Sequence, residues 1–184
     1  MLNEKSIRAK IGIFAIAVGL IGIIIAFFAP TIMTETLHFS QDNIILLTLK
    51  SSLIIAIVSL VLIVAILILL SLKATKVTFS LASLAIVVVL AFCTWSLTNY
   101  TAIQKEQIVM KSFNNEQILK WAEIEQVVYE YHDELPYGQY IFQTANEEMV
   151  ITETAKFGVE EKQKIYSTAR SFDVTFTERK LAKE

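Results

Sequence analysis

The chain divides into a first part with long apolar runs and a second part with short alternating runs. Three runs without a charged residue, at 11–29, 51–72 and 77–98, are each long enough to cross about 30 Å of hydrocarbon at roughly 1.5 Å per residue. The second is the most apolar, because sixteen of its residues are Leu, Ile or Val. We therefore predict three transmembrane helices within residues 1–100.

The links between these helices differ in length. The first helix is expected to stop at Pro30, and the residues before it, Ala26–Ala29, do not form a signal-peptidase site, so we expect a retained helix. A link of about Thr31 to Asn43 follows, and the apolar residues Ile44–Leu49 blur its far end. Lys73–Lys76 is a four-residue link, which predicts a tight hairpin of helices two and three.

Small residues recur along one side of the first helix. They are Gly12, Ala15, Gly19, Gly22, Ala26 and Ala29. Their spacing of three and four residues places them on one stripe, and small residues let a neighbouring helix backbone approach closely in a membrane. The stripe could pack against the chain's own helices two and three, or it could form the seam of a homo-oligomer.

Residues 101–184 read as a small β-rich α+β domain, so the fold class is a membrane section of three helices followed by this soluble domain. The expected strands are 103–105, 108–113, 118–131, 139–143, 149–154 and 173–177, with a turn at Asn114–Glu116 and a loop at His132–Pro136. Ile165, Ala169 and Phe172 are spaced as on one helix face, which predicts a helix over Val159–Ser171.

Charge differs between the two parts and limits the partners. Residues 1–100 carry six Lys or Arg and three Asp or Glu, whereas residues 101–184 carry ten basic and fifteen acidic groups. An acidic domain is a poor nucleic-acid binder and is poorly suited to anionic lipid surfaces. We therefore expect no nucleic-acid partner.

Basic residues near the helix ends predict the orientation. Lys5, Arg8, Lys10, Lys73 and Lys76 belong to one side of the membrane, and four lysines (Lys50, Lys105, Lys111, Lys120) to the other. Because cytoplasmic loops carry the excess of Lys and Arg, this predicts a cell-membrane protein with its N-terminus inside and its C-terminal domain outside. The margin is one residue, so a cytoplasmic C-terminal domain is the alternative.

Residues that could carry chemistry are few. No Asp, Glu, Lys, Arg or His lies in the core of a predicted helix, which disfavours a transporter or channel. His38 and His132 fall in predicted loops without a second ligand cluster, and Cys93 is the single cysteine. We expect no enzyme, metal, cofactor or small-molecule substrate. Tyr137, between Pro136 and Gly138, is the best candidate for an exposed interaction residue.

A family resemblance appears in the second part. The run Gln107-Ile108-Val109, a turn, and then Leu119–Val127 with Trp121, Ile124 and Val127 spaced Trp-x-x-Ile-x-x-Val resembles the bacterial pleckstrin-homology-like membrane proteins. Tyr140–Asn146, the next strand and the late helix follow in the family's order. The resemblance covers about Tyr100–Phe176 and implies a barrel-like scaffold.

Two features depart from that family. A strand follows the late helix, and the basic loop that lipid-phosphate-binding relatives use is absent. The expectation is therefore a non-enzymatic multi-pass membrane protein that presents this module for protein–protein contact or self-assembly. The alternative is a membrane-embedded sensor or accessory subunit whose first helix packs against another membrane protein.

Overall fold

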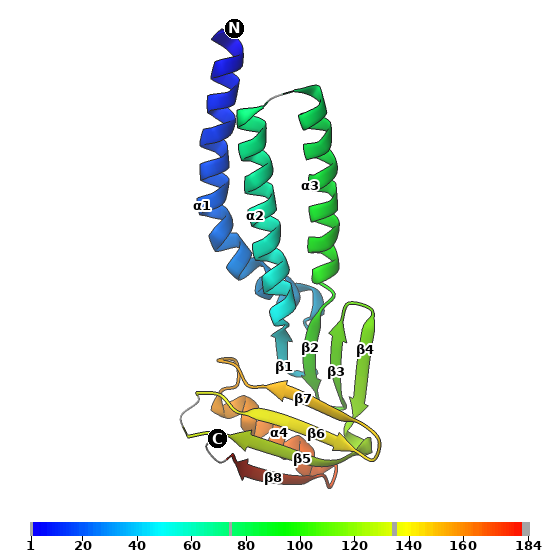
Figure 1. The fold of residues 1–184 in the computed structure, drawn as a ribbon. Coiled ribbons are helices and arrows are strands. Elements are labelled where there is room, and N and C mark those ends of the chain that lie inside the picture. Colours follow the sequence, from blue (N-terminus) through cyan, green and yellow to red (C-terminus); the bar gives the residue numbers. More distant parts are fainter. Residues whose placement is uncertain (1, 74, 134–135, 182–184) are drawn as a thin grey trace. The chain divides into compact units, whose positions relative to one another are not determined.

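The computed structural model describes residues 2–73, 75–133 and 136–181 (Figure 1). Its elements in chain order are α1 (Leu2–His38), β1 (Asn43–Thr48), α2 (Lys50–Leu72), α3 (Lys76–Ser96), β2 (Tyr100–Gln104), β3 (Gln107–Ser112), β4 (Asn115–Lys120), the 3₁₀ turn η1 (Trp121–Glu123), β5 (Ile124–Tyr131), β6 (Gln139–Thr144), β7 (Glu148–Thr152), α4 (Val159–Ser171) and β8 (Thr175–Lys180). The predicted class of three long apolar helices and a β-rich part with one late helix is present.

The chain forms two compact units. The helical unit comprises Met1–His38, Thr48–Tyr100 and Ser112–Asn114. The β unit comprises Phe39–Leu47, Thr101–Lys111 and Asn115–Glu184. The sequence predicts a single boundary between residues 100 and 101. The structure differs, because Phe39–Leu47, between α1 and α2, belongs to the β unit.

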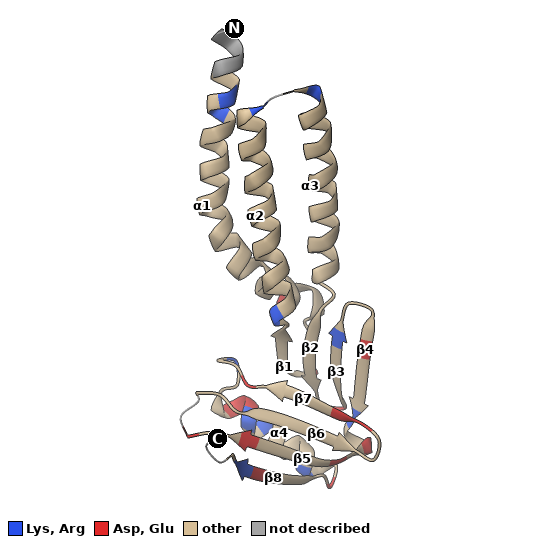
Figure 2. Cartoon of the chain, viewed as in Figure 1, with Lys and Arg blue, Asp and Glu red and all other residues tan. Residues whose placement is uncertain are grey.

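Within the helical unit, α2 lies between α1 and α3 (Figure 1). All three helices are long and apolar enough to cross a membrane, judged by length and composition. Their charged residues lie near the helix ends and not along the middle of the described helices (Figure 2). Helix α3 begins with a capping box, in which the hydroxyls of Thr75 and Thr78 each accept a hydrogen bond from the other residue's backbone N–H.

The first helix continues through Pro30 to His38, so the expected stop at Pro30 is wrong. Proline removes one backbone hydrogen bond, to the carbonyl of Ala26 four residues earlier, but it does not prevent a long apolar helix from continuing when neighbours pack around it. Pro30 and Ala26 are both buried. Figure 1 shows α1 changing direction in its last third, as expected for a proline inside a helix.

The β unit contains two four-stranded sheets with a shared core. Their strand orders are β1-β2-β3-β4 and β7-β6-β5-β8. In the second sheet β5 pairs antiparallel with β6 and parallel with β8, so the chain crosses over through α4 before β8. Ile165 and Ala169 of α4 are fully buried in the core, which places the helix on one face of this sheet (Figure 1).

Strand β1 was not expected as a strand. Ile45 and Leu47 alternate inward and are buried in the core of the β unit, and the Lys156 ammonium donates a hydrogen bond to the carbonyl of Leu46 at 3.1 Å. A short apolar run beside a transmembrane segment is equally consistent with a buried strand and with the start of a helix, because periodicity alone cannot distinguish these two structures. The link between α1 and α2 is therefore structured.

Two smaller boundaries also differ from expectation. The expected strand 118–131 is divided by η1, where Trp121 turns fully into the core and its indole N–H donates to the carbonyl of Gln104 at 2.8 Å. The turn between β3 and β4 lies at Phe113 and Asn114, and strand β4 already begins at Asn115. The predicted helix Val159–Ser171 is confirmed.

Candidate interaction surfaces

One face of the sheet β7-β6-β5-β8 points away from the core. Its residues, here called the outer sheet face, are Gln126, Val128 and Glu130 of β5, Gln139, Ile141 and Gln143 of β6, Glu148, Val150 and Thr152 of β7, and Thr175, Thr177 and Arg179 of β8. Strand register places them in three rows across the sheet, because paired residues point to the same side. The alternate residues, such as Val127, Phe142 and Met149, belong to the core.

The middle row is apolar and the rows beside it are polar. Val150, Ile141 and Val128 are neighbours across three strands, followed by Thr177 on β8. Ile141 and Val128 are buried, whereas Val150 is 41% exposed. A partly covered apolar centre with a polar border is the composition that protein interfaces use.

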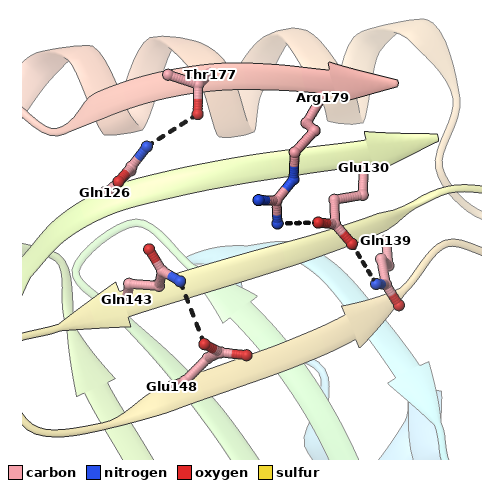
Figure 3. A network of polar contacts seen from close by, with 7 residues as sticks. All are labelled: Gln126, Glu130, Gln139, Gln143, Glu148, Thr177 and Arg179. Carbon is pink, nitrogen blue, oxygen red and sulfur yellow. Dashed lines mark hydrogen bonds and ion pairs between the residues drawn. The ribbon is translucent and has the colours of Figure 1, made fainter. Parts of the chain in front are cut away.

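Hydrogen bonds order the polar rows (Figure 3). The Gln126 amide donates to the Thr177 hydroxyl at 3.0 Å, and the Gln143 amide donates to the Glu148 carboxylate at 3.2 Å. At the other end, the Glu130 carboxylate accepts from the Gln139 amide at 2.7 Å and forms an ion pair with Arg179. The face therefore carries fixed donors and acceptors.

Glu130 is the most buried charge of this face, with its side chain 7% exposed. The hydrogen bond from Gln139 lowers the pKa of Glu130, burial opposes that change, and Arg179 adds to the lowering. The carboxylate is consequently ionised at neutral pH, and its charge is neutralised by Arg179.

The opposite end of the outer sheet face is acidic. Glu125, Glu147 and Glu148 line an open hollow there together with the polar side chains of Gln126, Gln143, Thr144, Asn146 and Thr175. Among the residues that the structure describes, no group of three or more His, Cys, Asp or Glu has metal-binding geometry. The hollow is thus an acidic surface whose natural complement is a basic group.

Tyr137 lies in the loop two residues before β6 and is 45% exposed. The chain beside it is held at Gly138, whose backbone N–H donates to the Glu153 carboxylate at 2.9 Å. The Glu153 N–H in turn donates to the carbonyl of Gly138 at 2.9 Å. A Cβ atom at position 138 would lie 2.4 Å from the carbonyl oxygen of Glu130, so this close approach requires glycine.

Glu153 is the centre of a buried polar cluster that the sequence did not reveal. Its carboxylate, 2% exposed, accepts from the Tyr129 hydroxyl at 2.9 Å and forms an ion pair with Lys162 of α4. The Lys162 ammonium also lies 5.5 Å from the centre of the Tyr129 ring. The cluster joins the end of β7, the loop at Gly138 and α4.

The pKa of Glu153 reflects this environment. Burial raises the pKa, but the hydrogen bonds from Lys162, Gly138 and Tyr129 together lower it below the ordinary value. Burial lowers the pKa of Lys162, but the hydrogen bond to Glu153 and its negative charge outweigh burial, so the pKa is raised. A charged pair at neutral pH follows. The alternation of Met149, Ile151 and Glu153 places the glutamate on the inward side of the strand, but a charged side chain is rarely fully buried unless it is paired, and its partners come from distant residues.

The small-residue stripe of α1 lies against α2. The Cβ positions of Gly12, Gly19 and Gly22 point at Ser71, Val64 and Leu60 of that helix. Ala15 and Ala26 are buried, and Ala29 is half-buried. Within the chain, the stripe therefore packs against α2.

The two histidines occupy different settings. His38 lies in the last turn of α1 and not in a loop, because the helix continues past Pro30. Its ring stacks on Tyr100 at 4.0 Å between ring centres, and its Nε2 lies 3.1 Å from the carbonyl oxygen of Leu97. His132 lies in a loop as expected, and the neighbouring Glu134 and Leu135 are outside the described residues.

The chain matches no sequence model of a protein family, and no curated protein is significantly similar to it.

Proposed function

We propose that this chain is a multi-pass membrane protein that presents a pleckstrin-homology-like module for protein–protein contact or self-assembly. In this proposal α1, α2 and α3 cross the bilayer and the β unit carries the interaction. The role is non-enzymatic, and phosphoinositide binding is not part of it, because the basic loop that such binding uses is missing from the sequence.

The helical unit supports the membrane part of the proposal. Large apolar side chains cover its outside; Ile13, Leu20 and Phe28 on α1 are each more than half exposed, as are Val61 and Leu69 on α2. In water, an exposed apolar surface of this extent would drive aggregation, whereas lipid tails would cover it without cost.

The β unit supports the proposed family. Trp121, Ile124 and Val127, the residues that carry the resemblance, are all buried in one core. Trp121 contacts Phe142 edge to face, with 5.8 Å between ring centres. The late helix α4 follows the strands in the order that the resemblance implies, whereas β1 before α2 and β8 after α4 add one strand to each sheet.

The outer sheet face is the observation that carries the proposed interaction. It has an apolar middle row centred on Ile141, with Val150 exposed at its end, and it is bordered by fixed polar groups. The acidic end at Glu125, Glu147 and Glu148 favours a partner surface with Lys or Arg. An apolar anchor with complementary charge at its border is a common recognition pattern.

Site-specific photocrosslinking in the full chain tests this proposal. A photoreactive amino acid at Val150 should give a covalent adduct in native membranes, with the adduct mass distinguishing a second copy from another protein. The matched control is Val159, which is 84% exposed on α4. The Glu147→Lys and Glu148→Lys substitutions together should weaken the Val150 adduct. No adduct at Val150, or equal adducts at both positions, would contradict the proposal.

A further inference from the structure

The turn between β3 and β4 carries an unusual residue for its backbone. Phe113 has φ of 51°, in the left-handed region that glycine and asparagine tolerate and bulky residues avoid. The other described non-glycine residue with positive φ is Asp173, a type that accepts this conformation more readily. A phenylalanine here points to a role for its side chain.

The turn belongs to the helical unit and is held there by α3 and the residues after it. Ser112–Asn114 group with the helices. The backbone N–H of Phe113 donates a hydrogen bond to the side-chain oxygen of Asn99, which is fully buried just beyond the end of α3. The strained backbone is thereby fixed in place.

The Phe113 ring is exposed and joins two aromatic side chains of α3. It meets Trp95 edge to face with 5.4 Å between ring centres, and Trp95 lies 6.2 Å from Phe92. All three rings are partly exposed, between 37% and 50%. Trp95 lies in the last turn of a helix apolar enough to span a membrane. This group of Phe92, Trp95 and Phe113 is here called the aromatic cluster.

Exposed aromatic side chains at the end of a spanning helix match the chemistry of the bilayer interface. Trp with its polar N–H is enriched at the level of the lipid headgroups, and aromatic rings supply a large apolar area at that depth. A hairpin turn held beside such a helix end can place its own ring in the same layer. We infer that Phe113 makes the β3–β4 turn a lipid-interface anchor, with the headgroup and glycerol region of the phospholipid bilayer as its partner.

This inference rests on the proposed membrane location and adds to it a second point of attachment that is not a helix. The anchor would restrict the motion of the β3–β4 turn, since lifting it out of the interface would expose the aromatic cluster to water. The backbone strain at Phe113 is compatible with this role because Asn99 holds the turn.

Lipid quenching of a fluorophore in the full chain tests the anchor. The chain is purified, labelled at Asn114→Cys in a Cys93→Ala background, and reconstituted in phosphatidylcholine–phosphatidylglycerol vesicles with nitroxide lipids. The expected result is a loss of emission that is larger with a nitroxide near the headgroup than with one deep in the acyl chain. Replacing Phe113 by Asn, which accepts the same backbone, should abolish that loss and leave the thermal midpoint in detergent unchanged.

A second label separates failure of the anchor from failure of the proposed membrane location. Val87→Cys on the exposed side of α3 should be quenched best by the deep nitroxide. If the label at Val87 is quenched and the label at Asn114 is not, the anchor alone is overturned. The anchor is also overturned if the label at Asn114 is quenched equally with and without the Phe113→Asn substitution. A label at Asn114 shielded from aqueous iodide in native membranes but unquenched by lipid overturns the lipid assignment in favour of a protein partner. No quenching at Val87 overturns both proposals.

Discussion

At the scale of single residues, the β unit depends on a few buried polar groups whose partners come from distant parts of the chain. Glu153 of the β7 end meets Tyr129, Gly138 and Lys162 from three separate elements. Glu130 meets Gln139 and Arg179 in the same way. Such groups cost free energy when unpaired, so they specify how the loop, sheet and helix α4 fit together.

Replacing Glu153 by Gln should lower the free energy of unfolding of the full chain at pH 7 by about 1–3 kcal/mol, because a charge-assisted hydrogen bond to Lys162 is lost. Thermal unfolding in detergent measures the effect. The control is Glu160→Gln in the exposed pair with Lys164 on the same helix, where solvent screens the charges and the loss should be much smaller. Equal losses in the two variants would show that the Glu153 cluster is not a stabilising unit.

The difference in stability between the natural chain and Glu153→Gln should depend on pH. The pKa of folded Glu153 lies below its ordinary value of 4.5, so the stability it contributes is present above pH 4.5. It is lost as pH falls through the folded pKa. The unfolding midpoints of the natural chain and Glu153→Gln should therefore converge as the solution is acidified below 4.5. A difference that stays constant across that range would argue against an ionised Glu153.

At the scale of elements, two glycines of the α1 stripe differ in how closely α2 approaches them. A Cβ atom at Gly19 would lie 3.7 Å from Val64, an ordinary contact, whereas at Gly22 it would lie 2.2 Å from Leu60. Gly19→Ala should therefore keep or raise the thermal midpoint in detergent, because it also removes a glycine from a helix. Gly22→Leu should lower it by separating α1 from α2. The reverse order would mean that the stripe does not face α2.

The strand β1 leads to a second prediction at this scale. Burying a side chain such as Ile45 or Leu47 contributes about 1.5–3 kcal/mol each, out of a typical domain stability of about 5–15 kcal/mol. Residues 101–184 alone should therefore fail to show a cooperative unfolding transition. Residues 39–49 joined by a short Gly/Ser linker to residues 99–184 should recover it, and Ile45→Asp should remove it again. Cooperative unfolding of 101–184 alone would contradict the role of β1.

These elements also show what the sequence can predict. The helix Val159–Ser171 follows from local spacing at Ile165 and Ala169, and β6 and β7 follow from local alternation. The partner of Ile45 is remote, since β1 joins a sheet with residues beyond 100, so no local signal distinguishes it from a helix start. The sequence marks Trp121 as part of a motif, but its turn out of the strand into the core depends on the packing of two sheets.

The candidate surfaces were predicted unevenly for the same reason. The small-residue stripe and the exposed Tyr137 are visible in the sequence, because helix periodicity and turn residues are local. The outer sheet face needs the register of four strands, including β8 across a helix. The aromatic cluster needs a turn at Phe113 to meet Trp95, eighteen positions earlier in the sequence.

At the scale of the whole molecule, strand pairing constrains the membrane arrangement. Strand β1 lies between α1 and α2, β2 follows α3, and the two are neighbours in one sheet. If the helices span, both segments must lie on the same side of the membrane, and the α2–α3 link with Thr75 must lie on the other. The charge distribution then predicts that Arg8, Lys10, Lys73 and Lys76 are inside, which places the β unit outside.

The sidedness of three single cysteines in a Cys93→Ala background tests whether the helices span the membrane with β1 and β8 on one side. It is read with a membrane-impermeant maleimide in intact cells and in inverted vesicles. The positions are Asp42→Cys before β1, Thr75→Cys between α2 and α3, and Glu178→Cys in β8. We expect Asp42→Cys and Glu178→Cys to react from one side, the outside, and Thr75→Cys to react from the other. Reaction of Asp42→Cys and Glu178→Cys from opposite sides would overturn this arrangement, because β1 could not then complete the β unit.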